Sequence, residues 1–119
     1  MNIKTLEHQY PLQPIAPIGR IGVIALGTDI NIEQDLRRMY PEGVEIFTSR
    51  VRNYNPLNIE NLRRMSETMT ATADTILPGT QLDAVIFGCT SGTVAIGAQK
   101  VEQLIQLSCP NVPVTNPFS

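Results

Sequence analysis

The sequence predicts an α/β protein in three layers, with a four-stranded parallel sheet between two layers of helices. Short apolar runs that are typical of buried strands recur four times along the 119 residues. Segments whose apolar residues have helical spacing separate these runs. Glycine, proline and asparagine stand at most of the boundaries. Strictly alternating strands and helices indicate a parallel sheet with right-handed crossovers.

The first 19 residues differ from the rest. Pro11, Pro14 and Pro17 disfavour a helix there, so residues 1–19 are expected to form an irregular lead along the domain surface. Residues 20–119 are expected to form the single α/β unit, and the nearly continuous apolar run 20–26 is its first strand.

A helix is expected to follow, with Asp29 or Asn31 as its cap. Its expected inner face carries Ile32, Leu36 and Met39. Residues 44–51 form the second predicted strand.

The second half repeats this pattern. Asn58 is expected to cap one long helix whose apolar stripe comprises Ile59, Leu62, Met65, Met69, Ala73 and Ile76. Residues 82–87 form the third strand, residues 88–92 a tight turn, and residues 93–107 a third helix with Val94, Val101, Leu104 and Ile105 facing inward. Residues 112–115 form a short fourth strand, with one edge of the sheet left uncovered.

Composition excludes several classes of function. The formal net charge of −2 gives no basic excess for nucleic-acid binding. No apolar run approaches the roughly 20 residues of a membrane helix, and the N-terminal residues lack the apolar core of a secretory signal, so a cytoplasmic protein is expected. No CxxC, HExxH or Cys/His cluster occurs, so no metal site is expected. A predicted helix of about 15 residues, roughly 22 Å long, separates Cys89 from Cys109, so no disulfide between them is expected.

Chemistry is expected beyond the carboxyl ends of the strands, where open parallel sheets bind ligands. The loops at that edge carry Thr28 and Asp29, then Ser49, Arg50, Arg52, Asn53 and Asn55, then residues 88–92, and finally Thr115 and Asn116. Arg50 and Arg52 are candidates for clamping a substrate carboxylate, although loop arginines are more often solvated. Asp29 is either a helix cap or a polar group of the cleft.

The turn 88–93, Gly-Cys-Thr-Ser-Gly-Thr, carries the most information. It puts the thiol of Cys89 between a buried strand and a helix N-terminus, where free N–H groups and the helix dipole favour an anion. Such surroundings make a cysteine a better nucleophile. The hydroxyls of Thr90 and Ser91 are placed to hold a carboxylate or an oxyanion. The alternative is structural: Cys89 is a small buried hydrophobe, and Thr90 and Ser91 only cap the helix.

Three segments together resemble a known family. They are residues 20–29 (RIGVIALGTD), 58–62 (NIENL) and 83–92 (DAVIFGCTSG). The chain resembles the aspartate/glutamate racemase superfamily, in the branch of maleate cis-trans isomerases, arylmalonate decarboxylases and the racemase-like protein of ectoine utilisation. The resemblance implies a flavodoxin-like half of a racemase-type fold, with no metal and no organic cofactor.

The resemblance also implies roles for individual residues. Cys89 matches the catalytic cysteine of the first lobe, and Thr90 and Ser91 match the oxyanion and carboxylate contacts beside it. Thr28 and Asp29 match the loop after the first strand, where the isomerases carry an asparagine. Arg52 and Asn53 complete the expected substrate-binding set by their position in the loop after the second strand, and the alternative for Asn53 is a turn former before Pro56.

The family's chain is roughly twice as long and has a second lobe with its own cysteine. The expectation is therefore a first lobe, completed by a second lobe or by a homo-oligomer. The expected function is an isomerase or racemase acting through Cys89 on a small carboxylate or dicarboxylate. Two alternatives remain open: a non-catalytic carboxylate-binding or oligomerisation module, and a lyase like arylmalonate decarboxylase.

Overall fold

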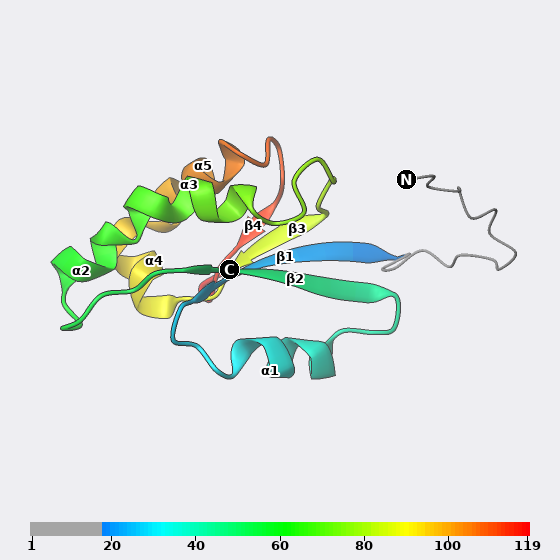
Figure 1. Cartoon of the computed structure of the whole chain (residues 1–119), viewed down its shortest axis with the longest axis horizontal. Coiled ribbons are helices and arrows are strands. Elements are labelled where there is room, and N and C mark those ends of the chain that lie inside the picture. The colour runs from blue at the N-terminus through cyan, green and yellow to red at the C-terminus, as the bar shows by residue number, and fades with distance from the viewer. Residues whose placement is uncertain (1–17) are drawn as a thin grey trace, which may run out of the picture.

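The computed structural model describes residues 18–119 as alternating strands and helices (Figure 1). In chain order the elements are β1 (Gly19–Leu26), α1 (Ile32–Met39), β2 (Val44–Val51), α2 (Ile59–Arg64), α3 (Ser66–Asp74), β3 (Ala84–Phe87), α4 (Thr90–Ile96), α5 (Ala98–Gln106) and β4 (Val114–Thr115). The expected lead comprises residues 1–19, of which residues 1–17 lie outside the described residues. Gly19 already belongs to β1.

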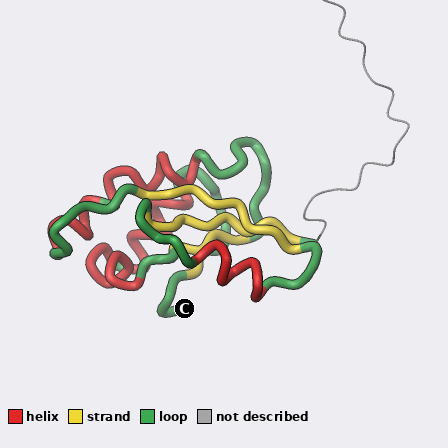
Figure 2. Tube along the Cα trace, turned by 60° about the horizontal axis from the view of Figure 1, so that its bottom comes forward, coloured by secondary structure: helices red, strands yellow, loops and turns green. Residues whose placement is uncertain are grey.

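The four strands form one parallel sheet in the order β2-β1-β3-β4. The apolar strand β1 therefore lies in the interior of the sheet, with β2 and β3 as neighbours (Figure 2). The short β4 is the far edge, as the sequence predicts. The parallel α/β fold expected from the alternation of elements is confirmed.

Helices cover both faces of the sheet, which gives the three predicted layers (Figure 1). Residues that are paired across two parallel strands point to the same face of the sheet. The contacts of Ser49 and Arg50, which are consecutive in β2, identify the two faces here. Ser49, aligned with Ile24, bonds through its hydroxyl to Thr75 at the end of α3. Arg50, one residue on, reaches Glu33 of α1 on the opposite face. The main core lies on the α3 and α5 side and includes Ile24, Val85, Phe87, Met69 and Ile105.

The two long predicted helices are each broken, which corrects the prediction. The segment after Asn58 divides into α2 and α3 at Met65, and the last helical segment divides into α4 and α5 at Gly97. Gly97 has φ +98°, a backbone angle that favours glycine and ends α4. The two helical segments break at corresponding places, since α2 packs on α4 and α3 packs on α5. Arg63 of α2 donates to the Ala95 carbonyl of α4, and Thr70 of α3 donates to the Leu104 carbonyl of α5.

Three apolar residues expected to face inward are instead exposed: Met39, Ile59 and Val94. In the short helix α1 no residue is buried, so the helix lies shallowly on the sheet. Ile59 and Val94 belong to α2 and α4, at the end of the molecule where the strands terminate (Figure 1). Among the described residues, no helix is long and apolar enough to cross a membrane.

Candidate functional site

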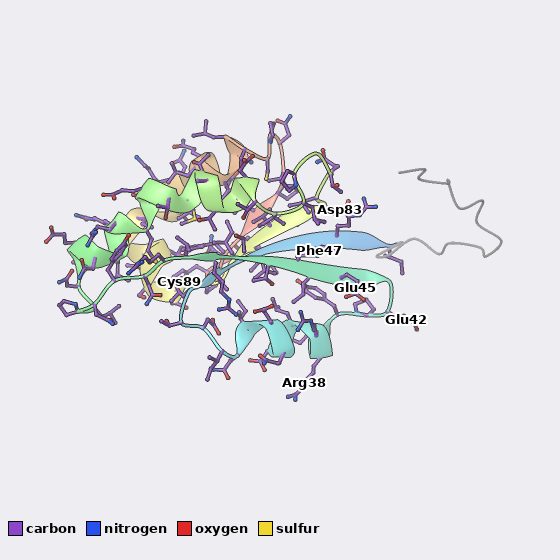
Figure 3. All side chains as sticks on the ribbon, viewed as in Figure 1. Arg38, Glu42, Glu45, Phe47, Asp83 and Cys89 are labelled. Atoms are coloured by element: carbon purple, nitrogen blue, oxygen red, sulfur yellow. The ribbon has the colours of Figure 1, made fainter. Side chains whose placement is uncertain are left out.

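The turn between β3 and α4 holds Cys89 at the cap position of α4 (Figure 3). The Cys89 sulfur accepts the backbone N–H of Gly92, with Sγ 3.2 Å from the nitrogen. The hydroxyl oxygen of Ser91 lies 3.7 Å from the same sulfur. The thiol therefore occupies the place where a serine or aspartate side chain commonly caps a helix.

The thiol is covered by neighbouring side chains. Cys89 is only 4% exposed and belongs to the main core. A Cβ placed on Gly92 would lie 2.6 Å from Met65 Cε, 3.0 Å from Cys89 Sγ and 3.2 Å from Phe87 Cζ. Glycine at position 92 is thus what lets Met65 and Phe87 approach the turn so closely. The covered sulfur fits the structural alternative as well as the catalytic one.

The hydroxyl-bearing residues of the turn divide into two kinds. Thr93 is buried, and its hydroxyl donates to the Cys89 carbonyl over 2.6 Å. Thr90 and Ser91 are exposed. The two residues proposed to hold a carboxylate are therefore reachable from solvent, whereas Thr93 stabilises the turn itself.

The loops after β1 and β2 meet beside one another. The Thr28 hydroxyl donates to the Asn53 side-chain oxygen over 3.4 Å. Gly27 lies beside this contact, since a Cβ there would be 3.5 Å from the same Asn53 oxygen, an ordinary van der Waals distance. The structure thus joins Thr28 and Asn53, and within residues 18–119 neither side chain bonds to the Cys89 turn.

Asp29 acts as a cap for α1. Its carboxylate accepts the backbone N–H groups of Asn31, at 2.8 Å, and Ile32, at 3.0 Å. The bonds from Ile32 and Asn31 lower the pKa of Asp29 below its usual 3.8; partial burial opposes the shift and the Arg50 charge adds to it. Asn31, the other predicted cap, makes no side-chain bond at this helix start.

Arg50 is not available as the carboxylate clamp that the sequence suggested. Its guanidinium donates to the carbonyls of Leu26, at 2.9 Å, and Asp29, at 2.6 Å, and it pairs with Glu33. These bonds fasten the loop between β1 and α1 to strand β2. The correction has a clear cause: the partners of Arg50 are 17 to 24 residues away in sequence, beyond any local pattern.

Arg52 instead belongs to a stack that sequence reasoning missed. The guanidinium carbons of Arg52 and Arg64 lie 5.7 Å and 3.8 Å from the centre of the Tyr54 ring. Within the described part of the chain, neither arginine forms an ion pair. Arg52 and Tyr54 lie in the loop after β2, and Arg64 lies at the end of α2. Two cationic groups from different segments thus contact the same aromatic ring. The only feature of the sequence that could have indicated this stack is the position of Tyr54 between two segments that contain arginine.

A hollow of about 400 Å³ adjoins the loop after β1 and is lined by Leu26, Thr28, Asp29, Ile30, Asn31, Ile32, Asp35 and Leu36. Cys109 lines a separate hollow of about 220 Å³, with Ser108, Leu82 and the loop after α3. Both cysteines are free thiols. Within residues 18–119, no cluster of three or more histidine, cysteine or acidic side chains could hold a metal ion.

Comparison with known proteins relates this geometry to solved structures. No model of a known protein family matches the chain, and no curated protein sequence matches it. The crystal structure of the maleate isomerase Iso from Pseudomonas putida superposes with a TM-score of 0.59 at 18% identity, over 82% of this chain and 44% of that one. A cysteine-to-alanine variant of the same isomerase, with maleate, gives a TM-score of 0.57 at 20% identity and the same coverage.

At these identities the likeness is one of fold, and the predicted resemblance is confirmed at that level. The chain spans less than half the length of the solved isomerase chains. It therefore has the α/β fold found in one part of the maleate isomerase structures.

Proposed function

We propose that the chain is the cysteine-bearing unit of a cofactor-independent isomerase or racemase acting on a small carboxylate or dicarboxylate. One observation carries the proposal: on the fold of a maleate isomerase, Cys89 stands between β3 and α4 with the Gly92 N–H directed at its sulfur. A donor in that position stabilises negative charge on the sulfur as a bond to substrate forms or breaks.

The exposed hydroxyls of Thr90 and Ser91 are the proposed contacts of the substrate carboxylate nearest the thiol. The Thr28–Asn53 pair and Arg52, on the adjoining loops, are the proposed contacts for the rest of the molecule. Arg52 carries a charge without an ion-pair partner in the described region, which suits a second carboxylate.

For a substrate with a carbon–carbon double bond, the proposed chemistry is covalent. The Cys89 thiolate adds to one alkene carbon. The π electrons move to the other alkene carbon and into the carboxylate attached to it, which becomes an enediolate. Rotation about the resulting single bond follows, and expulsion of the thiolate restores the double bond in the other geometry. Electrons balance without a metal or redox partner. Because Cys89 is only 4% exposed, substrate binding has to uncover the sulfur.

The burial of Cys89 favours a second candidate, a carboxylate-binding module in which the cysteine has only a structural part. Both candidates place a carboxylate on Thr90 and Ser91. They differ in whether the sulfur reacts.

The test uses the full chain with Cys109→Ser, so that Cys89 is the only thiol. The rate of alkylation of Cys89 is measured against pH, with and without millimolar maleate. The enzyme proposal expects alkylation in the folded protein and protection by maleate, with loss of both when Cys89→Ser is added. Binding that raises Tm equally with and without the thiol, with no alkylation, supports the binding module. A chain that neither reacts nor binds maleate contradicts both.

A further inference from the structure

A hollow lies between the loop after β1 and helix α1, and the reaction proposed above does not use it. Its volume is about 400 Å³, within the range of about 300–1,000 Å³ that is typical of small-molecule pockets. Four of its eight lining residues are aliphatic, namely Leu26, Ile30, Ile32 and Leu36. The side chain of Ile30 is 78% exposed, so a ligand in the hollow can contact it.

This hollow adjoins the proposed substrate site at two points. Thr28 lines the hollow and also donates its hydroxyl to Asn53, and this pair is a proposed contact for the part of the substrate away from the thiol. Ile32 lines the hollow from α1 and lies against Gly88, since a Cβ on Gly88 would clash with its side chain. Gly88 directly precedes Cys89. A molecule held between Thr28 and the Cys89 turn therefore has the hollow beside it.

The charges around the hollow decide which part of a substrate it can take. Asp35 lines the hollow and forms no ion pair within residues 18–119. The Asp29 carboxylate lines it as well, although it accepts two backbone N–H groups. Arg50, which donates to the Asp29 carbonyl, is already paired with Glu33. A carboxylate in the hollow would be repelled by two acids, whereas an alkyl group would pack on aliphatic side chains.

We infer that the hollow is the subsite for an apolar substituent, and that the substrate carries an alkyl group on the carbon next to a carboxylate. The inference rests on the function proposed above, which puts one carboxylate at Thr90 and Ser91. With the remainder of the molecule at the Thr28–Asn53 pair, the alkyl group extends past Thr28 to Ile30. An unsubstituted dicarboxylate such as maleate leaves the hollow empty.

A series of alkylated dicarboxylates tests the subsite through binding alone. The full chain is titrated by calorimetry with maleate, methylmaleate, ethylmaleate and propylmaleate. Each added carbon is expected to lower the Kd about threefold, so that propylmaleate binds about 30-fold tighter than maleate. Cys89→Ser is expected to show the same series, because the subsite acts through packing and not through the thiol.

A variant in the wall of the hollow shows where the alkyl group lies. Ile30→Ser is expected to reduce the ratio between the Kd values of maleate and propylmaleate to about tenfold or less, because an apolar contact is lost. Leu107→Ser is the matched control, because Leu107 is similarly exposed (72%) and lies at the end of α5. It is expected to leave the ratio at about 30-fold.

A charged probe tests the part played by the acids. Carboxyethylmaleate has a substituent as long as a propyl group but ends in a carboxylate, and it is expected to bind no tighter than maleate. Asp35→Asn is expected to lower the Kd of carboxyethylmaleate about threefold, since one repulsive charge is removed. Asp74→Asn, in which an exposed acid at the end of α3 is changed, is the control and is expected to have no effect.

The outcomes separate this inference from the proposed function. Equal Kd values along the alkyl series, or carboxyethylmaleate binding as tightly as propylmaleate, would overturn the subsite and leave carboxylate binding intact. An equal loss of the ratio in Ile30→Ser and Leu107→Ser would also overturn it. A chain that binds none of these dicarboxylates would overturn both proposals. A graded series in a chain whose Cys89 is not alkylated would support the subsite and contradict the enzyme.

Discussion

The sulfur of Cys89 accepts a hydrogen bond from the backbone N–H of Gly92, at 3.2 Å, and so caps helix α4. The residue proposed to react is therefore also part of the framework that holds the turn. Any test of its chemistry has to separate the loss of a nucleophile from the loss of a cap.

Substitution of Cys89 itself makes that separation. Cys89→Ala removes the acceptor for the Gly92 N–H and is expected to cost about 1 kcal/mol of unfolding free energy or more. Cys89→Ser keeps an acceptor at the cap position and is expected to cost less. Urea unfolding of both variants measures the difference. If serine costs more than alanine, apolar packing of the sulfur in the core outweighs its role as a cap.

Gly92→Ala is expected to disturb the same turn by crowding. The new methyl group would lie 2.6 Å from Met65 Cε and 3.0 Å from Cys89 Sγ, so at least one of the two has to move. Overpacking of a buried site costs about 1–3 kcal/mol. Ser91→Ala is the control on the same helix, because Ser91 is exposed and its change creates no contact. Equal stability of the two variants in urea would show that the neighbourhood of Gly92 is looser than the distances indicate.

Much of the fold could be predicted from the sequence because its strands are encoded locally. The apolar run 20–26 and the segment 44–51 match β1 and β2 within a residue, and Asn58 caps α2 as expected, its side chain accepting the N–H of Asn61 at 2.8 Å. The alternation of strands and helices then predicts that the strands run parallel.

The helix breaks could not be predicted from periodicity. A stripe of apolar residues continues across a small bend, so Met65 and Met69 fit one long helix as well as two short ones. Met65, where the break falls, lies close to Gly92, which is distant in sequence. Gly97 was a visible signal, but a lone glycine inside a helical pattern is often tolerated.

The candidate site was predicted in part for the same reason. The pattern located the Cys89 turn and the polar loops, because these follow directly from strand ends. It could not assign Arg50 to Glu33 or place Arg64 on the Tyr54 ring, because both contacts join different elements. Whether the loop residues act on a substrate remains a prediction.

Arg50 is expected to contribute more to stability than another arginine that pairs with the same acid. Arg50 and Arg37 both contact Glu33, but only Arg50 also bonds the carbonyls of Leu26 and Asp29. Arg50→Ala is therefore expected to lower the unfolding free energy by about 1 kcal/mol more than Arg37→Ala, whose exposed pair is worth little. Thermal or urea unfolding of the two variants measures this, and equal losses would contradict it.

The unfolding free energy of the chain is expected to depend on pH through Asp29. Its pKa in the folded chain is below the usual 3.8, chiefly because its carboxylate accepts the N–H of Ile32 and then that of Asn31. A lowered folded pKa means that Asp29 contributes stability above pH 3.8, and that the contribution is lost as the pH falls through the folded pKa. Asp29→Asn keeps a cap oxygen but cannot titrate. The difference in unfolding free energy between wild type and Asp29→Asn is therefore expected to shrink between about pH 6 and about pH 2.5, a window that spans the ordinary aspartate pKa. A difference that stays constant over that range would show that the charge of Asp29 does not stabilise the start of α1.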